Sequence, residues 1–149
     1  MKLKKYSVYL KKIKAYAKMC RVSIKFVNHM EEGGAYLGNR RSISISKKLS
    51  NIETIATLLH ELGHFIDDLR NPHNHLSNRF HNGARTAIEE DRKLTFLQKK
   101  RLLKIEREAW KNARALARQL DIPLGAWFYK DEKSALATYY AKKTIDQRV

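Results

Sequence analysis

Cysteine is almost absent from this 149-residue chain: the single Cys20 excludes an internal disulfide and a thiolate-rich zinc cluster. Only two prolines and six glycines occur, which leaves little room for a flexible linker. No run of about 18 apolar residues is present, and no apolar stretch follows the basic N-terminus as it would in a secretory signal. These absences predict one compact cytoplasmic domain over residues 1–149 and no membrane partner.

Acidic side chains are scarce as well, because 15 Asp and Glu stand against 31 Lys and Arg and leave a formal net charge of +16. The excess is uneven: residues 1–50 hold 13 basic and two acidic side chains, whereas residues 51–100 hold seven of each. The N-terminal third therefore predicts attraction to nucleic acid or another polyanion. A solvated basic face without a ligand explains the same pattern and stays open.

Hydrophobic periodicity predicts an α+β domain with a small, mostly antiparallel sheet. Strands are expected where apolar and polar residues alternate, at 22–27, 35–37 and 42–46, the short piece pairing with the first strand. Helices are expected at 3–20, 51–70, 87–120 and 131–143, with Ser50 and Glu53 capping the second and a break near Thr95 in the third.

The pattern H-E-x-x-H occurs at residues 60–64, inside the second predicted helix. His60 and His64 are four residues apart, so their imidazoles project from one helical face and can share a zinc ion. Glu61 is offset by one residue, where its carboxylate can take a proton as water attacks a carbonyl. Gly63 removes bulk where another element must approach the helix.

A zinc ion with one open position needs a third protein ligand. Cys20 is too isolated to supply it, and Arg70 stands where a third histidine would complete a metzincin pattern. Glutamates on the later helices are the leading candidates, with Glu106 first because it lies in a Glu-x-x-Ala pattern that lets the helices pack closely. The alternatives are Glu108, Glu132 and the loop histidines His73, His75 and His81.

Supporting roles are open at the remaining polar positions. Asp67 and Asp68 can orient the imidazole of His64 or form a solvated pair at the helix end. A donor for the oxyanion is also required, and the candidates are Tyr139, Tyr140 and His81. Trp110 and Trp127 are expected in the core rather than stacked on substrate.

The run from His60 to Asp68, followed by Glu106-Arg107-Glu108-Ala109, resembles the gluzincin-type zinc metallopeptidases. It is similar to the small ImmA/IrrE-type and phage-encoded neutral metallopeptidases and, locally, to the lethal-factor catalytic domain. The resemblance implies a zincin-like fold, a zinc ion on His60, His64 and Glu106, and Glu61 as the general base. It also implies that residues 42–46 form an edge strand that binds substrate in extended form.

The sequence therefore predicts a zinc-dependent peptidase acting on protein or peptide substrates. The resemblance adds phage or mobile-element origin, with action in the host cytoplasm or virion. One alternative is a basic nucleic-acid-binding or virion protein on the same fold, with mainly structural zinc. A hydrolase of non-peptide amides is the third reading.

Overall fold

The computed structural model describes residues 2–31, 33–71, 94–140 and 144–145. Predictions for 72–93 and 141–143, including the three loop histidines, lie outside these residues. The elements are α1 (Lys2–Met19), β1 (Ser23–Val27), β2 (Gly34–Leu37), the 3-10 turn η1 (Gly38–Arg40), β3 (Ser42–Ser46), α2 (Asn51–Arg70), β4 (Leu94–Thr95), α4 (Phe96–Gln119), α5 (Ala126–Tyr140) and β5 (Thr144–Ile145). The α+β class is confirmed.

The main sheet has the strand order β1-β3-β2. β1 runs parallel to β3, with Ser23 opposite Ser42, and β2 runs antiparallel to it, with Gly34 opposite Ile45. Three expectations are therefore wrong: the sheet is mixed, residues 42–46 form its centre rather than an edge, and residues 35–37 pair with β3 instead of β1. The central position suits β3 because Ile43 and Ile45 are fully buried.

Local capping sets the start of the two longest helices. The Ser50 hydroxyl accepts a hydrogen bond from the Glu53 amide at the start of α2. Thr95 and Gln98 form a capping box at the start of α4, at the predicted break. By contrast α5 begins at Ala126, five residues before the predicted start, because burial of Phe128 in the core outweighs the modest helix propensity of an aromatic run.

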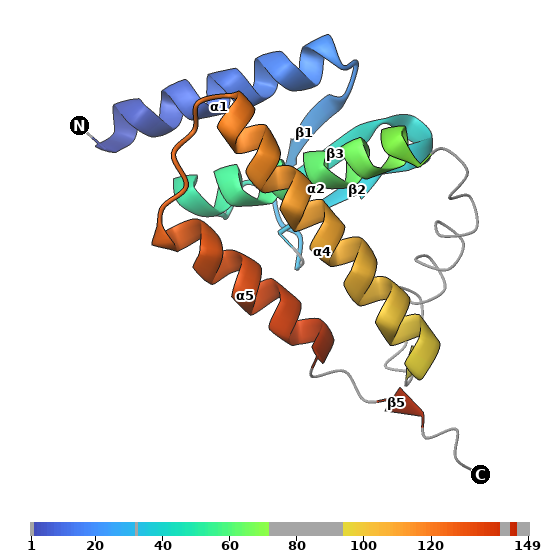
Figure 1. The fold of residues 1–149 in the computed structure, drawn as a ribbon. Coiled ribbons are helices and arrows are strands. Elements are labelled where there is room, and N and C mark those ends of the chain that lie inside the picture. Colours follow the sequence, from blue (N-terminus) through green and yellow to red (C-terminus); the bar gives the residue numbers. More distant parts are fainter. Residues whose placement is uncertain (1, 32, 72–93, 141–143, 146–149) are drawn as a thin grey trace.

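Helix α2 occupies the middle of the molecule, in contact with α1, the sheet, α4 and α5 (Figure 1). It packs most extensively against α4, which in turn contacts α5. The apolar faces of these elements form one core, whose fully buried members include Ile13, Ile43, Ile45, Ile55, Leu58, Leu59, Leu62 and Phe128. Among the described residues, no helix is both long and apolar enough to cross a bilayer. The residues of the H-E-x-x-H pattern thus lie on the most enclosed helix of the fold.

Candidate metal centre

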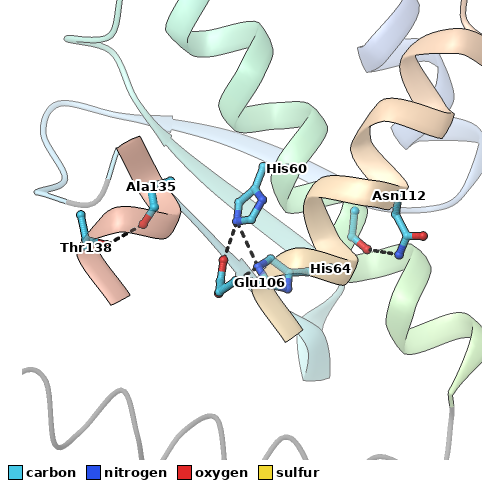
Figure 2. A network of polar contacts seen from close by, with 7 residues as sticks. His60, His64, Glu106, Asn112, Ala135 and Thr138 are labelled. Atoms are coloured by element: carbon cyan, nitrogen blue, oxygen red, sulfur yellow. Dashed lines mark hydrogen bonds and ion pairs between the residues drawn. The ribbon is translucent and has the colours of Figure 1, made fainter. Parts of the chain in front are cut away.

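Three side chains from two helices converge on one point: His60 and His64 of α2 and Glu106 of α4. His60 Nε2 lies 3.0 Å from Glu106 Oε2, and His64 Nε2 lies 3.4 Å from Glu106 Oε1. The two Nε2 atoms are 3.2 Å apart. Figure 2 shows the three side chains turned toward one another. The spacing of four residues places both imidazoles on the face of α2 that meets α4.

This donor set fits a zinc ion. Two ligands held by tetrahedral zinc at its usual bond lengths lie about 3.3–3.4 Å apart, close to the three separations in the cluster. Two imidazole nitrogens and one carboxylate are a common ligand set for zinc, which then keeps one position open. A metal ion binds imidazole in its neutral form, in which each ring offers one lone pair. Two such nitrogens and a carboxylate that converge on one point favour a cation there.

The other glutamates proposed as a third ligand lie elsewhere. Glu132 of α5 forms an ion pair with Arg114 of α4. Glu108 is half-buried on α4 and belongs to no metal-sized group of His, Cys, Asp and Glu among the described residues. Glu106 is 4 % exposed and faces α2. Of these three glutamates, the fold brings only Glu106 to the histidines.

Close contact between α2 and α4 brings Glu106 within reach. A Cβ atom on Gly63 would lie 2.1 Å from the carbonyl oxygen of Ala109, so the expectation that Gly63 admits a neighbouring element is confirmed. One turn further along α4, the buried Asn112 donates from Nδ2 to the Gly63 carbonyl at 3.1 Å (Figure 2). Arg70 donates to Asn112 Oδ1 at 3.2 Å. The spacing 106, 109, 112 thus forms one continuous contact face on α4.

The ring of His60 is oriented by stacking. Its centroid lies 4.3 Å from the Trp110 ring at an interplanar angle of 30°. Its Nδ1 atom is buried, with no hydrogen-bond partner within the described chain. Trp110 is 4 % exposed, in agreement with the predicted core position, and it continues into contact with Phe128. The aromatic core therefore fixes the plane of this candidate ligand.

The electrostatics of His64 favour positive charge at the cluster. Burial opposes protonation of the imidazole, but the carboxylate of Glu106, helped by Glu61 and Asp68, outweighs it and raises the pKa of His64 to about 9. Glu61, which follows His60 in the chain, is itself only 8 % exposed. Glu61 thus supplies a buried carboxylate whose charge acts on His64, and its role as a general base stays a prediction.

Asp68 connects the cluster to strand β2. Burial, followed by the negative charge of the nearby Asp68, raises the pKa of the Tyr36 phenol. A Cβ atom on Gly38 would lie 2.8 Å from Asp68 Oδ2. Asp67 and Asp68 were both considered as carboxylates that could orient the imidazole of His64. Asp68 lies between His64 and β2, whereas Asp67 accepts a hydrogen bond from the Asn71 side chain.

Sequence reasoning missed Tyr36, Arg70 and Asn112. The signal at Asn112 is a polar residue inside the apolar stripe of α4, three residues after Ala109. Tyr36 gives no comparable signal, because its contact with Asp68 depends on how β2 lies against α2. Of the candidate oxyanion donors, Tyr140 is exposed beneath the guanidinium of Arg107 and Tyr139 is half-buried on α5. His81 lies outside the described residues.

Comparison with known proteins gives no relative: no family model, no curated protein and no solved structure matches this chain.

Proposed function

We propose that this chain is a zinc-dependent peptidase whose metal is held by His60, His64 and Glu106. The observation that carries the proposal is the convergence of two imidazole nitrogens and the two oxygens of one carboxylate at zinc-like separations, with the buried Glu61 next to His60 in the chain. A structural zinc site is closed by four protein ligands, whereas three ligands are typical of a hydrolytic site. In the part of the chain that the structure describes, three side chains form the cluster, which favours catalysis over a purely structural metal.

Each side chain has a distinct task in this reaction. A divalent cation at the cluster supplies the Lewis acidity that polarises the water and the scissile carbonyl. Glu61 accepts a proton as the water oxygen bonds to the carbonyl carbon, and donates it to the nitrogen as the C–N bond breaks. Trp110 and Asn112 hold the ligand-bearing helices in place, and burial of the cluster restricts competing water.

The strand arrangement favours a peptide over other amides. β2 is bonded to β3 on one side, and no strand covers its other side within the described parts of the chain. It runs alongside α2, with Gly34 against Thr57 and with Gly38, the first residue of η1, against Asp68, and so passes the turn that carries both histidines. An extended peptide can add to such an edge through backbone hydrogen bonds. This assigns to β2 the role that the resemblance gave to residues 42–46.

The decisive experiment measures metal content and hydrolysis on the same samples. The wild type should bind about one zinc per chain and cleave a labelled unfolded protein. Glu61→Gln should retain zinc but lose about 10²–10⁴-fold in turnover, whereas Glu108→Gln, the same change outside the cluster, should leave both unchanged. Full turnover in Glu61→Gln would overturn the role of the base.

The third ligand is tested by three alanine variants. Glu106→Ala should lose zinc, while Glu108→Ala and Glu132→Ala should keep it. Because Trp110 stacks on His60, its fluorescence should change when zinc or cobalt is added, which gives a readout independent of activity. A folded wild type that binds neither metal would exclude the zinc peptidase.

A further inference from the structure

A groove separate from the metal cluster lies where the first half of α1 meets the connection between α4 and α5. It has a volume of about 270 Å³ and is lined by Lys5, Tyr6, Tyr9, Pro123, Leu124, Gly125 and Trp127. The connection passes beside α1 in Figure 1, and Lys12 donates to the carbonyl of Asp121 at 3.4 Å. The groove shares no residue with the His60, His64 and Glu106 cluster.

Three aromatic side chains form the apolar part of this groove. Tyr6 and Tyr9 contact each other edge to face at 6.4 Å. Trp127 is half-buried rather than enclosed in the core as expected, and it contacts the fully buried Phe128 at 5.9 Å. Its indole packs so closely on Gly125 that a Cβ there would lie 2.8 Å from the ring. Trp127 is thus a supported, partly open aromatic surface.

The charged side chains that α1 places around these rings are all positive. This helix contains seven lysines and no acidic residue. Lys5 is exposed and lines the groove, Lys4 precedes it, and Lys12 lies on the same side of the helix two turns later. None of the lining residues is acidic, and the nearest acidic position in the connection, Asp121, is exposed beside Lys12. A ligand in this groove therefore meets aromatic faces and ammonium groups together.

We propose that this groove binds single-stranded nucleic acid. Single strands are held by stacking of unpaired bases on aromatic rings while lysines contact the phosphates. A duplex hides its base faces within the stack, so it can contact the lysines through its phosphates but cannot stack on the aromatic rings. An acidic peptide has carboxylates but seldom the flat rings that Trp127 and Tyr6 complement. The partner that matches both properties is a single strand.

The position of the groove allows a nucleic acid in the groove and a metal ion at the cluster to be bound at the same time. Trp127 contacts Phe128, Phe128 contacts Trp110, and Trp110 stacks on His60. Three ring contacts therefore separate the groove wall from the nearest candidate ligand. A strand bound here would hold the chain on nucleic acid without contacting the three residues of the cluster. The binding proposal itself does not depend on peptidase activity.

The test measures binding of a fluorescent thymidine oligonucleotide to the full chain by anisotropy. Lys5→Glu should weaken binding at least tenfold. Lys11→Glu makes the same charge change on the same helix, about 120° away from Lys5, and should weaken it less than threefold. Affinity should also fall steeply as salt rises from about 50 to 200 mM. Equal losses in the two lysine variants would overturn the groove and leave only diffuse attraction.

Stacking is tested at Trp127. Trp127→Ala should weaken oligonucleotide binding about tenfold, and Trp127→Phe should recover part of the loss, with folding checked by circular dichroism. Heparin, a polyanion without bases, should bind equally well to the wild type and to both variants. The proposal fails if the Trp127 variants bind the oligonucleotide as well as the wild type does, as is expected for heparin. It fails too if a duplex binds as tightly as the single strand. Displacement of the strand by anionic vesicles or poly-glutamate at equal charge would also overturn it. If Trp127→Ala does not fold, the comparison of Lys5 with Lys11 decides alone.

Discussion

The contact between α2 and α4 and the groove beside α1 hold their polar groups in different ways. At the helix contact, Glu106 and Asn112 are 4 % and 3 % exposed and each is matched to a partner on α2. In the groove, Lys5 is exposed and the aromatic rings are half-buried. Buried polar groups cost free energy unless they are paired, so the first region depends on exact distances. The second depends mainly on charge and on access.

This difference predicts where single substitutions act. Small changes at the helix contact should alter stability and metal binding together, because the two share the same residues. Changes in the groove should alter ligand binding while the fold persists. Substitutions at the helix contact should therefore have larger effects than substitutions at more exposed sites.

The largest effect is expected at Gly63. Gly63→Ala places a methyl group 2.1 Å from the Ala109 carbonyl oxygen, so α2 and α4 must separate. Overpacking of this kind costs about 3 kcal/mol, which lowers Tm by roughly 6–12 °C for a chain of this length. Thermal unfolding measures it, and Ala115→Ser, which adds one atom at an exposed position of α4, should change little. An unchanged Tm for Gly63→Ala would show that this contact tolerates expansion.

Metal should stabilise the folded state by a similar amount. Zinc at about 100 times its Kd adds about 2.7 kcal/mol to the free energy of unfolding if it binds only the folded chain. The increase should disappear with a chelator and in His60→Ala, which removes one candidate ligand. His29→Ala, at an exposed position, should keep it. A zinc-dependent rise in Tm that persists in His60→Ala would place the metal elsewhere.

The next effect concerns the buried amide of Asn112. Asn112→Ala removes the donor to the Gly63 carbonyl and the acceptor for Arg70, and such losses cost about 2 kcal/mol. Zinc affinity should fall as well, because the contact face that carries Glu106 loosens. Urea unfolding and zinc titration measure the two effects. Arg70→Ala, at the exposed end of the same chain of bonds, should cost about 0.5 kcal/mol.

The sequence anticipated the parts of this site that depend on local spacing. Two histidines four residues apart must share a helical face, and a small residue between them admits a neighbouring helix, as Gly63 does. The start of α2 was predicted from the local cap at Ser50, and the break expected near Thr95 lies where α4 begins. These features depend on a few consecutive residues and on helix geometry alone.

Other features depend on how elements cross and could not be read along the chain. Glu106 and Glu108 differ by about 200° around α4, so the angle at which α4 meets α2 decides which one faces the histidines. Alternation predicted the strand β3 but not which strands pair with it, since the pairing order is set by the whole sheet. Trp127 combines a contact to the core with a half-open face, and an aromatic residue in a sequence carries no sign of which face is covered.

The smallest effect is expected at Asp131 on α5. Burial, then the charge of Glu53 on α2, raises the pKa of Asp131 above its usual value despite Lys130. A carboxyl whose pKa is raised on folding favours the folded state most below its unfolded pKa, near 3.8, and loses that contribution as pH rises through the folded pKa. At neutral pH the ionised group is therefore mildly destabilising. Asp131→Asn should raise Tm by about 1–2 °C at pH 7, since solvent screens much of the repulsion.

The pH dependence separates this cause from a general loss of negative charge. The advantage of Asp131→Asn should shrink toward pH 4, where the carboxyl of the wild type takes up its proton. Glu31→Gln, which removes one exposed acid, should give little change in Tm at either pH. If Asp131→Asn stabilises equally at pH 4 and pH 7, the ionised state of Asp131, disfavoured by its burial and by Glu53, is not the cause. In that case the contact between α2 and α5 would be governed by packing, like the contact between α2 and α4.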